Sequence, residues 1–75
     1  MDPARFARLR GTVVAFDRSV GLGEVRADGG ECYRFHATRI ADGLRAVDVG
    51  ATVEFTVAAV GLGAWEAVEL AAVGL

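Results

Sequence analysis

Cys32 and His36 are the two residues of this chain whose types and spacing could hold a metal ion. They lie an even number of positions apart, so on a strand both side chains would lie on one face. A zinc site needs at least three protein ligands, and the chain contains one cysteine and one histidine. We therefore expect no metal, and we interpret Cys32 as a buried residue that packs like a small apolar side chain.

Catalysis by a nucleophile or by acid–base chemistry would also depend on His36, the only histidine. No serine or cysteine has a plausible base and orienting acid beyond it, and the carboxylates are scattered over expected turns and strand exteriors. Gly21 and Gly23 lack the third glycine and the Lys-Ser/Thr pair that hold a dinucleotide or a triphosphate. A strand that bends, or that another backbone approaches closely, explains these glycines better. We expect neither an enzyme nor a cofactor.

Length and charge limit the other function classes. The 75 residues form a single domain with one small core. Ten acidic residues against eight basic ones give a net charge of −2, without the basic excess typical of proteins whose affinity depends on phosphate contacts. The sequence has no signal-like apolar region and no membrane-spanning run, and a lone cysteine does not indicate secretion. We expect a cytoplasmic protein without membrane contact.

Short β-type segments alternate with glycine turns along the chain. Four segments are rich in Val, Thr and Phe or alternate apolar with polar residues, namely 9–16, 21–27, 32–36 and 52–60. Polar or glycine-rich turns at 17–19 and 28–30 join the first three into a meander. Residues 38–46 form a longer connection with one helical turn. The expected interior residues are Val13, Val25, Tyr33, Phe35, Ile40, Val53, Phe55 and Val57.

Three motifs carry a resemblance to a known family. The chain reads G-T-V-V-A-F-D at 11–17, V-G-L-G-E-V at 20–25 and Y-R-F-H-A at 33–37. In order and spacing these segments resemble the G-T-V-K-W-F, K-G-F-G-F-I and V-F-V-H-F motifs of cold-shock domains, over about residues 10–70. The family pattern makes the alanine-rich segment 64–73 a fifth strand, although its composition also permits a helix. The resemblance implies an all-β, five-stranded antiparallel OB-fold barrel at 9–73, after an N-terminal extension at 1–8.

The family binds single-stranded RNA and DNA, and it acts in RNA chaperoning and transcription antitermination. In this chain most of the residues that stack on bases are replaced. Ala15 stands where the family has Trp, Leu44 replaces an aromatic residue after the Asp42-Gly43 turn, and four residues stand where the family has Phe: Leu22, Glu24, Arg34 and Ala37. Losing four or five stacking contacts at about 1 kcal/mol each predicts affinity about three or more powers of ten lower. The carboxylate of Glu24 would also repel a phosphate backbone.

Two rings and several arginines remain on the expected binding face. Phe16 and His36 keep rings at matching positions, and Arg34 lies on the same strand face as His36, while Tyr33 and Phe35 point inward. Arginine can stack on a base as well as pair with a phosphate. The residues that we expect to contact nucleic acid are Phe16, Arg18, Leu22, Arg26, Arg34, His36 and Arg39, with Arg45 nearby. Alternatively, the arginines are solvated charges that pair with neighbouring carboxylates.

Trp65, the only tryptophan, lies at the start of the expected fifth strand. If Val68 and Leu70 both belong to the core, a bulge or irregular turn lies near Glu69. Trp65 then either fills the core or anchors a protein partner or a second copy, together with apolar termini around Phe6, Leu9 and 73–75. Two functions follow, a weak binder of single-stranded nucleic acid and a protein-interaction module that has lost nucleic-acid binding.

Overall fold

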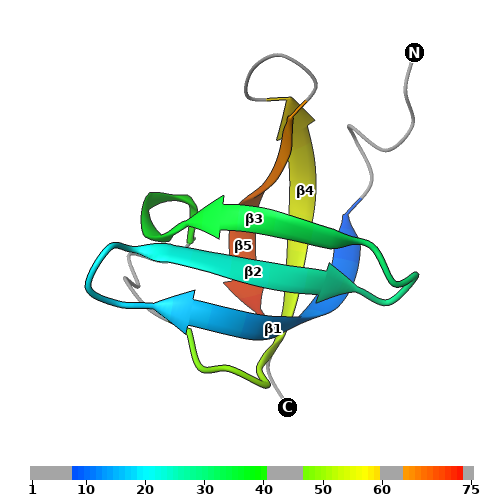
Figure 1. Cartoon of the computed structure of the whole chain (residues 1–75). Coiled ribbons are helices and arrows are strands. Elements are labelled where there is room, and N and C mark those ends of the chain that lie inside the picture. Colours follow the sequence, from blue (N-terminus) through cyan, green and yellow to red (C-terminus); the bar gives the residue numbers. More distant parts are fainter. Residues whose placement is uncertain (1–7, 41–46, 60–63, 74–75) are drawn as a thin grey trace.

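The computed structural model describes residues 8–40, 47–59 and 64–73. Five strands form a closed barrel (Figure 1), and they are β1 (Leu9–Asp17), β2 (Leu22–Ala27), β3 (Cys32–His36), β4 (Thr52–Ala59) and β5 (Trp65–Ala72). A 3₁₀ turn, η2 (Ala37–Arg39), follows β3. The expected all-β five-stranded barrel is confirmed. η2 overlaps the start of the connection 38–46, in which one helical turn is expected, and residues 41–46 of that connection lie outside the described residues. Leu44, Arg45, Phe6 and the Asp42-Gly43 turn lie outside the described residues.

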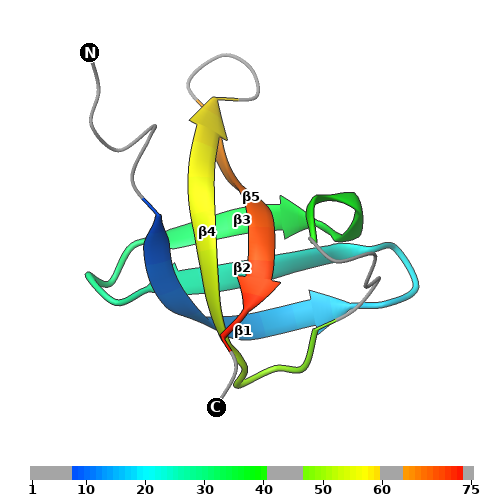
Figure 2. The same ribbon diagram turned by 180° about the vertical axis from the view of Figure 1, so that it is seen from behind.

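The strands meet in the order β1-β2-β3-β5-β4. β1, β2 and β3 form an antiparallel meander, and β4 pairs antiparallel with both β1 and β5. The closing pair is parallel, because β3 and β5 meet through Arg34 opposite Glu66, with a further bridge between Ile40 and Leu70. Figure 2 shows β4 and β5 crossing steeply over the far side of the meander. The meander therefore presents one broad outer face, built from β1, β2 and β3.

Apolar side chains from all five strands fill the barrel. Of the residues expected inside, Tyr33 is half-buried and the others are buried: Val13, Val25, Phe35, Ile40, Val53, Phe55 and Val57. Ala27, Ala67 and Leu70 complete the buried set. The rings of Tyr33 and Phe55 pack in a tilted arrangement with centroids 5.9 Å apart. The alternation in the sequence therefore predicted this core correctly.

The pair Gly21 and Gly23 has the structural role that the sequence suggests. Gly21 has a φ of +70°, a conformation that side-chain-bearing residues rarely adopt. At Gly23 a Cβ atom would meet the ring of Phe35 and would lie 2.9 Å from the carbonyl oxygen of Ala15. Gly21 is therefore needed for the turn into β2, and Gly23 for the close approach of β2 to Phe35 and to the backbone of β1.

β5 contains the irregularity expected near Glu69. The β4–β5 register shifts between Glu54 and Thr56, and Glu69 has a φ of 55°. The extra residue lets both Ala67 and Leu70 point inward, whereas Val68 is half-buried rather than part of the core. The Thr56 hydroxyl donates a hydrogen bond of 3.0 Å to Glu69 Oε1. Arg8 Nη1 donates to the Glu69 carbonyl oxygen over 2.8 Å.

The side chains of Cys32 and Trp65 both face the solvent. Cys32 is exposed, so the prediction that it is buried was wrong. It shares the outer face of β3 with Arg34 and His36, because Tyr33 and Phe35 occupy the inward positions between them. Trp65 is 44% exposed, which decides against the core-filling interpretation.

Candidate nucleic-acid interface

A shallow hollow of about 390 Å³ lies on the outer side of the meander. Its lining comes from the end of β1, the start of β2 and the middle of β3: Ala15, Phe16, Asp17, Leu22, Gly23, Glu24 and Arg34. Ala15 contributes little bulk where the resembled motif has Trp. The hollow therefore opens at the point where a large ring is replaced by a methyl group.

The middle of this face carries two opposite charges side by side. Glu24 lies directly opposite Ala15 on β1 and directly opposite Arg34 on β3. Both charged side chains are exposed, and neither forms an ion pair with another described residue. Across such an antiparallel pair, Cβ atoms lie about 4.5–5.5 Å apart. Glu24 and Arg34 thus give the hollow an acceptor group and a donor group, side by side, that are both available to a ligand.

The next row along the face contains Leu22, which pairs with Asp17 on β1 and with His36 on β3. His36 Nε2 lies 3.4 Å from Glu66 Oε2 on β5. The side chain of Glu66 is only 16% exposed, so it holds the imidazole against the closing seam of the barrel. No sequence pattern indicates Glu66, because its contact depends on the parallel register of two strands that are distant in the chain.

Asp17 forms the charged edge of the hollow. The hydroxyl and backbone N–H of Ser19 donate to Asp17 Oδ1 over 2.7 and 2.9 Å. These hydrogen bonds, the hydroxyl first, hold the pKa of the Asp17 carboxyl below its ordinary value. Asp17 therefore stays negative under all mildly acidic conditions, and it disfavours phosphate at this edge.

Phe16 lines the hollow but is not a free stacking platform. It is half-buried and pairs with Gly23, and its ring lies nearly parallel to that of buried Phe35, with centroids 5.8 Å apart and an interplanar angle of 4°. Its ring thus supports the floor of the hollow. Among the described residues of the outer face, His36 is the aromatic ring that remains exposed.

The other expected contact residues are more dispersed. Arg26 is exposed one row further along, opposite Thr12 and Cys32, and Arg18 is exposed in the turn between β1 and β2. Arg39, on η2, lines a separate hollow of about 560 Å³ with residues of β4 and β5. The structure therefore brings Phe16, Leu22 and Arg34 together, places His36 beside them, and leaves these three arginines around the periphery.

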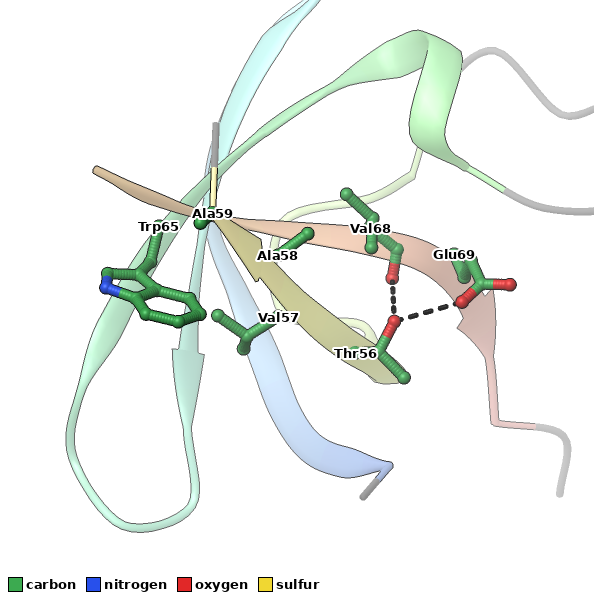
Figure 3. Close-up of a pocket in the computed structure, with 7 residues that line it drawn as sticks. All are labelled: Thr56, Val57, Ala58, Ala59, Trp65, Val68 and Glu69. Atoms are coloured by element: carbon green, nitrogen blue, oxygen red, sulfur yellow. Dashed lines mark hydrogen bonds between the residues drawn. The ribbon is translucent and has the colours of Figure 1, made fainter. Parts of the chain in front are cut away.

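A third hollow, of about 480 Å³, lies on the β4–β5 hairpin (Figure 3). Trp65 lies beside Val57 at one end, and the Thr56–Glu69 hydrogen bond lies at the other. Ala58, Ala59 and Val68 complete the lining. The exposed indole is therefore part of a shaped surface with a mixed polar and apolar lining.

Two features are absent from the described residues. In the described ranges, no group of three or more His, Cys, Asp or Glu side chains is arranged to hold a metal ion. Over the same part of the chain, no helix is long and apolar enough to cross a membrane.

Comparison with known proteins finds similar chains among solved structures. No family model and no curated protein matches the chain. Among solved structures, a Drosophila Unr structure described as CSD456 (cold-shock domains 4–6) superposes with a TM-score of 0.75 and 26% identity over 91% of this chain. The chain has the fold of a cold-shock domain. It spans 27% of the length of that Unr chain.

Proposed function

We propose that this barrel binds single-stranded RNA or DNA weakly through the outer face of β1, β2 and β3, in RNA chaperoning or transcription regulation. The observation that carries the proposal is the exposure of Arg34 and His36 around the hollow of a cold-shock fold. A guanidinium can stack on a base or bind a phosphate, and an imidazole ring can stack. The proposed role is binding without catalysis.

Charge explains why the proposed binding is weak. Asp17, Glu24 and Glu66 lie on or beside the face that carries Arg34 and His36. Phosphate contacts therefore contribute little net affinity, and few rings are available for stacking at about 1–3 kcal/mol per base. We expect a dissociation constant in the micromolar range or weaker, with affinity that falls as salt is raised.

Fluorescence anisotropy with labelled oligothymidine and pyrimidine-rich RNA at low salt tests the proposal. Arg34→Ala and His36→Ala should each weaken binding. Arg10→Ala is the matched control, because Arg10 is exposed on β1 but pairs with Glu54 at 3.4 Å, away from the hollow. Tight binding that survives both test substitutions would place the site elsewhere. Absence of binding to any oligonucleotide at low salt would refute the proposal.

The second candidate function is a protein-interaction module that uses the hairpin hollow. Its support is Trp65, which is exposed beside Val57 rather than packed in the core. Partly apolar protein contacts depend much less on salt than phosphate contacts do. Sedimentation equilibrium at low and high salt tests for a second copy as the partner. Self-association that persists in high salt and disappears in Trp65→Ala would favour this function.

A further inference from the structure

We propose that the hollow on β1–β3 selects guanine within the single-stranded ligand, through Glu24 and Arg34. This inference rests on the proposed function, because it assigns a base preference to the same face. The two side chains lie directly opposite each other on neighbouring strands, both exposed and neither in an ion pair with another described residue. They form an acceptor group and a donor group at adjacent positions of one surface.

The other carboxylates near this face already have partners. Asp17 accepts two hydrogen bonds from Ser19, both on Oδ1, and Glu66 lies against His36. Glu24 accepts no hydrogen bond from a described side chain, and its neighbour across β1 is the small residue Ala15. Its two carboxylate oxygens are therefore accessible from within the hollow.

Guanine has the edge that complements this pair. A carboxylate only accepts hydrogen bonds and a guanidinium only donates them. The Watson–Crick edge of guanine carries two adjacent donors, N1–H and the N2 amino group, beside the O6 acceptor. The donors fit the two oxygens of Glu24, while Arg34 donates to O6. Charge-assisted hydrogen bonds of this kind are about twice as strong as neutral ones.

The other bases match less well. Adenine and cytosine each carry one amino donor on this edge beside acceptors, and thymine or uracil carries a single N–H between two carbonyl groups. Each would leave a carboxylate oxygen unpaired or would place a carbonyl oxygen against it. A good bidentate contact discriminates by about 5- to 150-fold against the wrong base.

The interpretation of Glu24 as purely repulsive makes the opposite prediction for one substitution. Glu24→Gln removes the charge with little change in shape. If the carboxylate only repels phosphate, the variant binds every oligonucleotide more tightly by one common factor. If it accepts from guanine, the variant loses affinity for guanine-containing strands while its affinity for oligothymidine stays equal or rises.

The experiment titrates wild type, Glu24→Gln and Glu54→Gln with matched strands, as DNA and as RNA. One strand is all thymine or uracil, and the others carry isolated guanines, adenines or inosines at the same positions. Glu54→Gln is the control for charge, because it removes a carboxylate that pairs with Arg10 on the β1–β4 side. Circular dichroism confirms folding of each variant.

We expect wild type and Glu54→Gln to bind the guanine strand about tenfold more tightly than the other strands. Replacing guanine with inosine should remove most of this preference. Glu24→Gln should show no preference for the guanine strand. Oligothymidine binding without a guanine preference would overturn the inference and leave the proposed function standing. A common gain on all strands in Glu24→Gln would overturn it as well. Absence of binding to every strand would refute both.

Discussion

The ring of Phe35 occupies the space into which a side chain at Gly23 would extend. β2 and β3 pair these two residues directly, and Phe16 stacks on the same ring from β1. The missing side chain on β2 therefore lets two phenyl rings pack under the hollow. The shape of the candidate binding face therefore depends on Gly23 as well as on the exposed residues.

Gly23→Ala should lower the free energy of unfolding by about 1–3 kcal/mol, because the new Cβ displaces Phe35 or strains the backbone near Ala15. Urea unfolding followed by circular dichroism measures the change. Gly29→Ala is the control, since its Cβ would meet nothing within 4 Å and its φ is not positive. That variant should differ from wild type by less than about 0.5 kcal/mol. Equal stabilities for the two variants would contradict the packing described above.

The interior of the barrel was predictable from the sequence because alternation on a strand maps directly onto burial. Val53, Phe55 and Val57 illustrate this. The same rule could have placed Cys32 correctly, since it lies at even spacing from Arg34 and His36 on the outer face. The general tendency of cysteine to be buried does not hold here, because strand alternation decides which face its side chain occupies.

The candidate site was only partly predictable. The motifs indicated Phe16, Leu22, Arg34 and His36, but the His36–Glu66 contact depends on strand register across a parallel seam. Residue spacing contains no information on that register. The positive φ of Glu69 was equally hidden, because nothing in a glutamate side chain indicates a left-handed backbone. Only the need for an irregularity nearby could be inferred.

The backbone strain at Glu69 predicts that glycine is better than alanine at this position. Glycine adopts a φ of 55° freely, whereas alanine keeps the cost of about 1 kcal/mol. Both substitutions lose the hydrogen bond from Thr56, and both keep the backbone oxygen that accepts from Arg8. Glu69→Gly should therefore be about 1 kcal/mol more stable than Glu69→Ala in urea unfolding.

Glu66 provides the matched comparison for that prediction. It lies in the same strand without a positive φ, so Glu66→Gly should be less stable than Glu66→Ala by about 0.5–1 kcal/mol. The glycine variant should thus be the more stable one at position 69, and the alanine variant the more stable one at position 66. The same order at both would show that Glu69 is not strained in solution.

Tyr33 should ionise only at strongly alkaline pH. The pKa of the Tyr33 hydroxyl is raised above its ordinary value of 10.0. Burial is the largest cause, and the next is the hydrogen bond that the hydroxyl donates to Glu31 Oε2 over 3.2 Å. The folded state favours the neutral phenol, so its contribution to stability is complete below the unfolded pKa and is lost as pH rises through the folded pKa. Because Tyr33 is the only tyrosine, tyrosinate absorbance measures it directly.

Glu31→Gln separates the two causes. It should lower the pKa of Tyr33 but leave it above that of the urea-unfolded chain, since burial remains. A midpoint equal to that of the unfolded chain would mean that the carboxylate, rather than burial, dominates.

Restoring rings to the outer face should restore strong binding of pyrimidine strands. Ala15 and Glu24 are exposed, Leu22 is half-buried at the surface, and none belongs to the core. The triple variant Ala15→Trp, Leu22→Phe and Glu24→Phe adds three stacking partners and removes one repulsive charge. At about 1–3 kcal/mol per ring, affinity for oligothymidine should rise at least about a hundredfold.

Titration of the triple variant beside wild type measures this gain, and circular dichroism verifies that the barrel is intact. The matched control introduces a ring outside the hollow with Thr52→Phe, an exposed position at the start of β4 that pairs with Thr12 of β1. This variant should leave oligothymidine affinity unchanged. The hollow would be filled in the triple variant, so any guanine preference should disappear while total affinity rises. A folded triple variant that gains less than about tenfold would mean that this face is shaped for something other than nucleic acid. The hairpin surface around Trp65 would then become the primary candidate for function.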